Sequence, residues 1–171
     1  MIRIRPPRDE DAAALVAMVA ALSTLEGDEV GRFDEAAARR FVIAPEGPVS
    51  CLIAEEGARP VGFVFWHVAW ETPIARPGAF VTDLYVVEER RGGGLGLDLL
   101  RAAAREVKAA GGAFLWLTAL RRNERARAFY RRFMEEEAHI ANYWADGARF
   151  DALLLGAAPR ASEPDEPTPS P

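Results

Sequence analysis

The sequence predicts a mixed α/β (α+β) domain, and three observations lead to that prediction. Short apolar runs typical of β-strands alternate along the chain with segments whose apolar residues recur every three to four positions, as they do on helices. A glycine-rich loop separates the strongest strand signal from the strongest helix signal. The chain has 171 residues, half of them hydrophobic, which suits one domain with a sizeable core.

The first part of the chain predicts a strand followed by two helices. Residues 2–5 alternate apolar and charged side chains, and Asp9 is a candidate N-cap for a helix over residues 10–22. Residues 23–33 are rich in glycine and acidic side chains and predict a loop. A second short helix is expected over residues 34–41.

The middle of the chain predicts most of a sheet and its longest helix. Residues 49–55 and 61–68 form a predicted hairpin around a Glu-Gly turn, and residues 79–87 form a third apolar strand. Residues 97–110 carry an apolar stripe at helical spacing, and residues 113–119 read as a buried strand.

The last part predicts a helix, a hairpin and a tail. Residues 123–133 are expected to be helical, and Asp146-Gly147 is expected to join strands over residues 139–144 and 148–155. The folded domain is therefore expected to span residues 1–157. Residues 158–171 are rich in Pro, Ser and acidic side chains, a composition typical of disorder.

Composition and charge narrow the classes of function. The net charge of −5 argues against a nucleic-acid-binding domain, which usually carries a basic face. No apolar run approaches the ~20 residues needed to span a bilayer, and the N-terminus lacks the pattern of a signal peptide. The single cysteine, Cys51, is expected to be a small buried hydrophobe. No Cys/His cluster indicates a metal site, and a cytoplasmic location is expected.

The glycine loop is the first candidate functional element, because a helix that begins directly after it offers free N–H groups to a phosphate. The dinucleotide pattern G-x-G-x-x-G fails, since Leu97 or Leu99 stands where a third glycine is needed, and no Gly-Lys-Ser/Thr of a P-loop follows. A flexible turn remains an alternative. The candidate phosphate-binding residues are Arg91, Gly92, Gly93, Gly94, Leu95, Gly96 and Leu97.

Two motifs together carry a resemblance to a known family. Arg91, Gly94 and Gly96 fill an Arg-x-x-Gly-x-Gly pattern, and an N-x-x-A-x-x-F-Y run from Asn123 to Tyr130 follows the next strand. This combination resembles the GCN5-related N-acetyltransferases (GNAT family). The resemblance implies a mixed central sheet of six to seven strands flanked by about four helices. It also implies an enzyme that binds acetyl-CoA as co-substrate and transfers the acetyl group to the amine of a small molecule.

The resemblance implies roles for individual residues. Leu84, Tyr85 and Val86 would line a slot for the cofactor where a bulge splays their strand from the next one. Asn123, Ala126 and Tyr130 would contact the cofactor; an N-cap is the structural alternative for Asn123, and core packing is the alternative for Tyr130. As a catalytic residue, Tyr130 would protonate the leaving thiolate.

The acceptor amine needs a base, because an alkylamine with a pKa near 10 is protonated at neutral pH. Glu26 and Asp83 are the preferred catalytic candidates, ahead of His67. The aromatic hairpin and the acidic segments are similar to those of the diamine and polyamine acetyltransferases. In that group a catalytic carboxylate occupies the position of Thr82. The expected substrate-binding residues are Leu25, Glu26, Thr82, Asp83 and Thr118.

Other functions stay open at this point. The acceptor can be an aminoglycoside or a protein amine, and a catalytically inactive CoA-binding sensor is a further alternative. Beyond the small-molecule substrate, the expected partner is a second copy of the chain, since many members of the family pair through their C-terminal strands. A homodimer without nucleic-acid or membrane partners is therefore expected.

Overall fold

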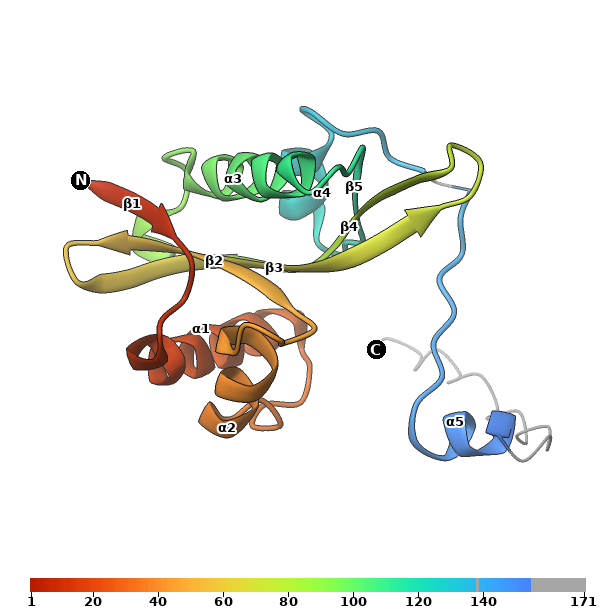
Figure 1. Ribbon diagram of the computed structural model, residues 1–171, viewed down its shortest axis with the longest axis horizontal. Helices are drawn as coiled ribbons and strands as arrows, with labels where there is room; N and C mark the ends of the chain where they lie inside the picture. The colour runs from red at the N-terminus through yellow and green to blue at the C-terminus, as the bar shows by residue number, and fades with distance from the viewer. Residues whose placement is uncertain (138, 155–171) are drawn as a thin grey trace, which may run out of the picture. The chain divides into compact units, whose positions relative to one another are not determined.

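The computed structural model describes residues 1–137 and 139–154, which divide into one unit over residues 1–127 and a second from Ala128 onward. The first unit is built on a sheet that has five strands within the described residues, in the order β1-β2-β3-β4-β5 (Figure 1). Neighbouring strands are antiparallel except β4 and β5, which are parallel. The strands are β1 (Ile2–Arg5), β2 (Ser50–Glu56), β3 (Arg59–Glu71), β4 (Arg76–Val86) and β5 (Leu115–Leu117).

Helices cover both faces of this sheet (Figure 1). On one face, here named the α1 face, lie α1 and α2; the opposite face, named the α3 face, is covered by α3. The helical segments of the first unit are η1 (Asp9–Asp11), α1 (Ala12–Glu26), α2 (Glu35–Ala37), η2 (Ala38–Ile43), η3 (Glu88–Arg90), α3 (Leu95–Ala109) and the start of α4 (Glu124–Tyr130). The second unit contains the end of α4 and α5 (Gly147–Leu154).

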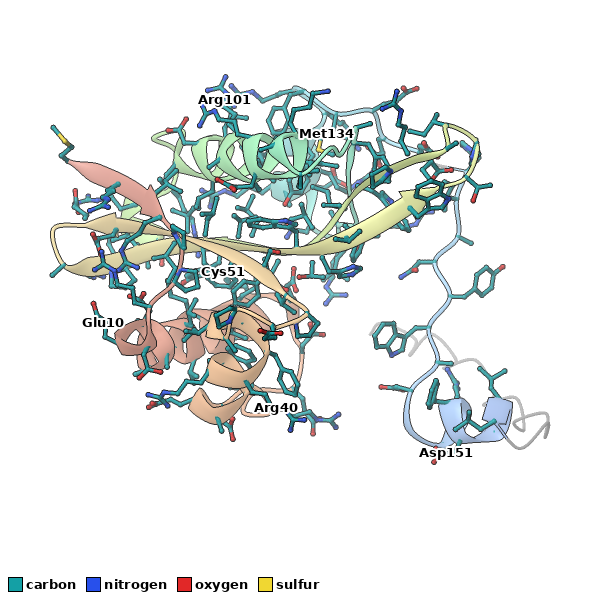
Figure 2. All side chains as sticks on the ribbon, in the orientation of Figure 1. Glu10, Arg40, Cys51, Arg101, Met134 and Asp151 are labelled. Carbon is teal, nitrogen blue, oxygen red and sulfur yellow. The ribbon has the colours of Figure 1, made fainter. Side chains whose placement is uncertain are left out.

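The main apolar core lies on the α1 face. Its buried members come from α1, η2 and strands β2, β3 and β4, and they are Leu15, Met18, Val42, Cys51, Ile53, Phe63, Phe65 and Tyr85. Figure 2 labels Cys51 between the sheet and the helices of this face. Cys51 is buried, as the sequence predicted. Burial raises the pKa of its thiol far above the ordinary value, so the side chain stays protonated and packs as a small hydrophobe.

The α3 face is covered by the strongest amphipathic helix of the chain. Residues three and four positions apart on α3 are buried toward the sheet, and they are Leu95, Leu99, Leu100, Ala102, Ala103 and Val107. The opposite side of the helix is polar and includes the exposed Arg101 (Figure 2). Since α3 also connects the parallel strands β4 and β5, its packing fixes where β5 joins the sheet.

A buried ionic network joins β1, η1 and β2. The guanidinium of Arg5 is 5% exposed and forms two hydrogen bonds to the carboxylate of Asp11, at 2.7 and 3.0 Å. Its Nε also donates to Glu55 at 2.7 Å. Asp11, 3% exposed, accepts a further hydrogen bond from the Arg8 N–H at 2.6 Å. Each of these polar groups is satisfied, which makes the charges tolerable inside the protein.

The first helix differs from its prediction at both ends. Asp9 is not its N-cap: Arg8 precedes the initial 3-10 turn, and the carboxylate that accepts a backbone N–H there is that of Asp11. The helix runs to Glu26 and ends only at Gly27, whose φ of +75° is a common helix stop. The predicted loop over residues 23–33 therefore begins with a helical turn, and Glu26 lies on a helix.

The C-terminal hairpin prediction is wrong for the described residues. Residues 139–144 form no strand, and Gly147–Leu154 is the helix α5. The N–H groups of Arg149 and Phe150 donate to the Asp146 carbonyl, so the Asp-Gly pair starts a helix instead of closing a hairpin. Ala, Arg and Leu favour helix over strand, and this outweighs the short apolar alternation. The boundary predicted after residue 157 and the tail over 158–171 lie outside the described residues.

The sheet is correspondingly smaller than predicted. It has five strands within the described residues instead of six to seven, although the mixed α+β architecture is as expected. The predicted strand over residues 113–119 shortens to Leu115–Leu117, and Trp116 is half exposed instead of buried. Trp116 is opposite Phe80 of β4, and the centres of the two rings lie 4.9 Å apart.

The Arg5–Asp11 pair predicts a large stability loss when one partner is removed. Asp11→Ala leaves the buried guanidinium without its main partner, and we expect a loss of about 3–5 kcal/mol in the free energy of unfolding, measured by urea denaturation. The matched control is Glu10→Ala, since Glu10 forms an exposed pair with Arg8 at 3.4 Å and its loss should cost less than ~1 kcal/mol. Equal losses in the two variants would contradict the role of the network.

Candidate active site

One extra residue in β4 changes the direction of its side chains. Phe65 of β3 is opposite Asp83, whereas the next residue, Trp66, is opposite Val81, so Thr82 is the extra residue of a β-bulge. Because successive residues of a strand alternate between faces, the bulge places Asp83 on the α1 face, next to the buried Phe65.

Beyond the bulge, β4 separates from β5. The two strands pair only from Ala79–Val81 to Leu115–Leu117. The N–H of Val87 donates to the Val61 carbonyl of β3, so by antiparallel alternation the backbone groups of Leu84 and Val86 face away from β3. The strand thus presents the backbone of Leu84 and Val86 at its unpaired edge, while Tyr85 contributes a buried side chain to the α1 face.

The glycine loop is anchored by the side chains of its two arginines. Arg90 donates to Glu56 at 2.6 and 2.9 Å, and Arg91 Nε donates to the Val86 carbonyl at 2.8 Å. The Arg91 guanidinium also lies 5.4 Å from the centre of the Tyr85 ring. Arg91 therefore holds the loop against the end of β4, which leaves the backbone N–H groups of the loop as the candidate anion-binding groups.

The helix after the loop begins earlier than predicted. Gly94 is its N-cap, with a φ of +88° that favours glycine, and Leu95, Gly96 and Leu97 form the first turn. The first N–H groups of a helix have no acceptor four residues earlier, and they lie at the positive end of the helix dipole. The Leu97 N–H donates to the Gly94 carbonyl at 2.9 Å, so the loop and the N–H groups of Leu95 and Gly96 have the geometry of a phosphate-binding site.

A hydrogen bond joins Asn123 to Ala126 at the start of α4. The Asn123 side-chain oxygen accepts a hydrogen bond from the Ala126 N–H at 3.0 Å, so Asn123 is the N-cap of α4. The predicted N-cap role is confirmed, and it orients the Asn123 amide at the start of α4. Thr118 is exposed and directly follows β5.

The two preferred carboxylates, Glu26 and Asp83, lie within electrostatic reach of each other. Burial raises the pKa of Asp83 above its ordinary value, and a hydrogen bond from Thr82 partly opposes the shift. Burial also raises the pKa of Glu26, with further contributions from the negative charges of Asp28 and Asp83, while Arg122 opposes them. Two interacting carboxylates with raised pKa values are typical of groups that exchange protons.

The other predicted residues are placed as follows. Leu25 is 62% exposed at the end of α1, and Thr82 lies beside Asp83 as its hydrogen-bond partner. His67 is exposed on β3, with its ring 5.5 Å from that of Phe80. Tyr130 is the last residue of α4 and belongs to the second unit, where its ring lies 5.2 Å from that of Phe129.

Sequence reasoning missed Arg122, which contacts the end of α1. Its neighbour Asn123 carried the motif, but nothing in the pattern distinguished Arg122 from the adjacent Arg121.

Within residues 1–137 and 139–154, no group of three or more His, Cys, Asp and Glu side chains could hold a metal ion. None of the helices in the described part of the chain has the length and hydropathy that crossing a bilayer requires.

Comparison with known proteins gives one family and many similar folds. The model of the acetyltransferase (GNAT) family matches residues 16–134. No curated protein matches the sequence. Similar solved structures include an integron cassette protein from V. cholerae, 21% identical over 90% of this chain and 97% of that chain, with a TM-score of 0.74.

Two further structures are acetyltransferases by name. A ribosomal-protein-alanine N-acetyltransferase from Brucella melitensis is 21% identical, with 86% of this chain and 100% of that chain covered and a TM-score of 0.70. An aminoglycoside acetyltransferase from an uncultured soil metagenomic sample, in complex with sisomicin, is 17% identical, with 85% and 97% covered and a TM-score of 0.70. At these identities the likeness concerns the fold.

The raised pKa of Asp83 predicts that its charge reduces stability. A carboxyl with a raised folded-state pKa binds its proton more tightly in the folded chain, so stability falls as pH rises from the ordinary value toward the folded value. Asp83→Asn should therefore raise the Tm at pH 7 by about 2–4 °C. The gain should shrink as the pH approaches ~4, measured by calorimetry.

The matched control for this prediction is Asp98→Asn, because Asp98 is an exposed residue of α3. This substitution should change the Tm little at either pH. An Asp83→Asn variant that is less stable than the wild type at pH 7 would show that the Asp83 carboxylate is a structural hydrogen-bond partner and not a strained functional group.

Proposed function

Because the chain belongs to the acetyltransferase (GNAT) family, we propose that it acetylates a small polycationic amine of the diamine or polyamine class. Enzymes of this family use acetyl-CoA as co-substrate, and the chain is an acetyl-CoA-dependent N-acetyltransferase. The choice of a cationic acceptor rests on one observation, the interaction of the Glu26 and Asp83 carboxylates. Asp83 lies on the α1 face, just beyond the point where β4 stops pairing with β5.

The cofactor side of the site follows from backbone geometry. The N–H groups of the glycine loop and the first turn of α3 suit the pyrophosphate of acetyl-CoA. The unpaired edge of β4 at Leu84 and Val86 offers N–H groups for the amides of the pantetheine arm and for the thioester carbonyl. Such donors stabilise the negative charge that develops on a carbonyl oxygen during acyl transfer.

Asp83 is proposed as the base. Acetyl-CoA supplies an activated thioester, and the amine nitrogen forms the new bond to the acetyl carbon as the carbon–sulfur bond breaks. The proton released by the amine goes to the Asp83 carboxylate, whose raised pKa makes it a stronger base than an exposed aspartate. Tyr130 is proposed to supply a proton to the sulfur, so that the thiol leaves neutral. The ammonium nitrogen loses two protons in all: the first goes to Asp83, and the second, lost after the new bond forms, restores the Tyr130 hydroxyl.

The charges and rings on the α1 face support a cationic acceptor. The negative charges of Asp28 and Asp83 act on the Glu26 carboxylate, and the positive charge of Arg122 opposes them. The ring of the part-buried Phe33 lies 6.1 Å from that of Phe65, a core residue opposite Asp83. Carboxylates attract ammonium groups, and the less buried ring of Phe33 is the candidate for a cation–π contact.

An aminoglycoside is the second candidate acceptor. Such a molecule also carries several ammonium groups, so the same carboxylates would attract it. One similar structure is an aminoglycoside acetyltransferase in complex with sisomicin, which motivates the inclusion of this class in the assay.

The acceptor class is tested by thiol release from acetyl-CoA with putrescine, spermidine, thialysine and sisomicin. We expect turnover with a diamine or polyamine and a fall of at least ~100-fold in kcat for Asp83→Asn, because the base is lost. Turnover with sisomicin alone would replace the first candidate by the second. Acetyl-CoA binding without thiol release from any amine would contradict the proposed acceptors and favour a CoA sensor.

Tyr130→Phe tests the proposed acid. Removing the hydroxyl should lower kcat by roughly 10- to 100-fold, because the thiolate must then leave without a nearby proton donor. The Kd of acetyl-CoA, measured by calorimetric titration, should change less than about twofold. The matched control is Tyr143→Phe, which removes the hydroxyl of a residue that is 90% exposed. Unchanged turnover in Tyr130→Phe would remove Tyr130 from the acid role.

A further inference from the structure

Arg122 connects two segments that are far apart in the sequence. It lies between β5 and α4, and its Nη2 donates a hydrogen bond to the main-chain carbonyl of Glu26, the last residue of α1. The last carbonyls of a helix have no intrahelical partner, and they form the negative end of its dipole. A guanidinium at this point satisfies one carbonyl and complements the dipole.

The contact also includes the glycine that ends the helix. Gly27 follows Glu26 with a φ of +75°, and a β-carbon built on it would lie 3.6 Å from Arg122 Nη2. The guanidinium therefore lies within van der Waals contact distance of the helix end. Because the contact is made to main-chain atoms, it fixes the position of the helix end itself.

The same guanidinium acts on the Glu26 side chain. The charged groups that influence this carboxylate are Asp28 in the following loop, Asp83 in β4 and Arg122. The first two are negative, so Arg122 supplies the opposing positive charge. Without it, three negative charges would repel one another at the end of α1.

Building on the proposed acetyl transfer, we propose that Arg122 is a positioning residue that holds Glu26 beside Asp83 for binding of the acceptor ammonium group. Arg122 directly precedes Asn123, the N-cap of α4 that is expected to contact the cofactor. The loop between β5 and α4 thus holds both Arg122, which contacts the end of α1, and Asn123, the N-cap of the helix proposed to bind the cofactor. Arg122 acts through Glu26 and Gly27 and takes no part in the chemical step.

Arg122→Ala should weaken acceptor binding selectively. We expect the KM of the acceptor to rise about five- to tenfold, the effect of losing one charge-assisted contact, with kcat and the KM of acetyl-CoA within about twofold of the wild type. The acidic limb of the pH profile of kcat/KM should move to higher pH, because the group that opposes the raised pKa of Glu26 is gone.

Two further variants separate charge from geometry. Arg122→Lys keeps the positive charge but loses the planar fork, so we expect the pH profile to return toward that of the wild type while the acceptor KM stays partly raised. Arg121→Ala removes the neighbouring exposed arginine and should leave the acceptor KM and the pH profile unchanged. If Arg121→Ala and Arg122→Ala give the same change, general surface charge is responsible and the proposal is wrong.

A readout without turnover separates this proposal from the proposed function. Carbon-detected NMR titration of the Glu26 carboxyl should give a higher midpoint in Arg122→Ala than in the wild type, with an intact fold confirmed by the amide spectrum. A shifted midpoint without acetylation of any amine would leave the positioning role in place and overturn the acceptor proposal. An unshifted midpoint, or equal rises in the KM values of both substrates, would overturn the role of Arg122.

Discussion

The arrangement of the site depends on one extra residue in β4. The bulge at Thr82 reverses which face each later side chain occupies, since a shift of one residue moves a strand's side chains to the opposite face. Without it, Asp83 would point toward α3, away from Glu26. The parallel pairing with β5 also stops at Val81, next to the bulge, so one local irregularity coincides with both the carboxylate and the open strand edge.

Two further segments contribute to the candidate site, the end of α1 and the glycine loop. α1 brings Glu26 because it continues for one more turn than its apolar pattern indicates and ends at Gly27. The glycine loop is held to the same strand by Arg91, which donates to the Val86 carbonyl on the edge that β5 leaves unpaired. The glycine loop and the Glu26–Asp83 pair thus share β4 as their common support.

Local signals explain what the sequence predicted correctly. The glycine loop before α3 and the Asn123 cap each depend on a few neighbouring residues, so their chemistry is visible in the chain. The bulge at Thr82 and the contact of Arg122 with α1 depend on residues that meet only in the folded protein. The C-terminal prediction failed because the helix-favouring Ala, Arg and Leu of residues 147–154 outweighed a short apolar alternation.

Binding an ammonium group and removing its proton make opposite demands on a carboxylate. Binding favours an ionised group, whereas proton removal favours a high pKa, and the two carboxylates of this site have surroundings that divide these tasks. Burial dominates at Asp83, where only the Thr82 hydroxyl opposes it. At Glu26 the guanidinium of Arg122 counteracts burial and two negative neighbours. In the proposed mechanism, Arg122 therefore favours an ionised Glu26 for binding, and the more buried Asp83 is better suited to accept the proton.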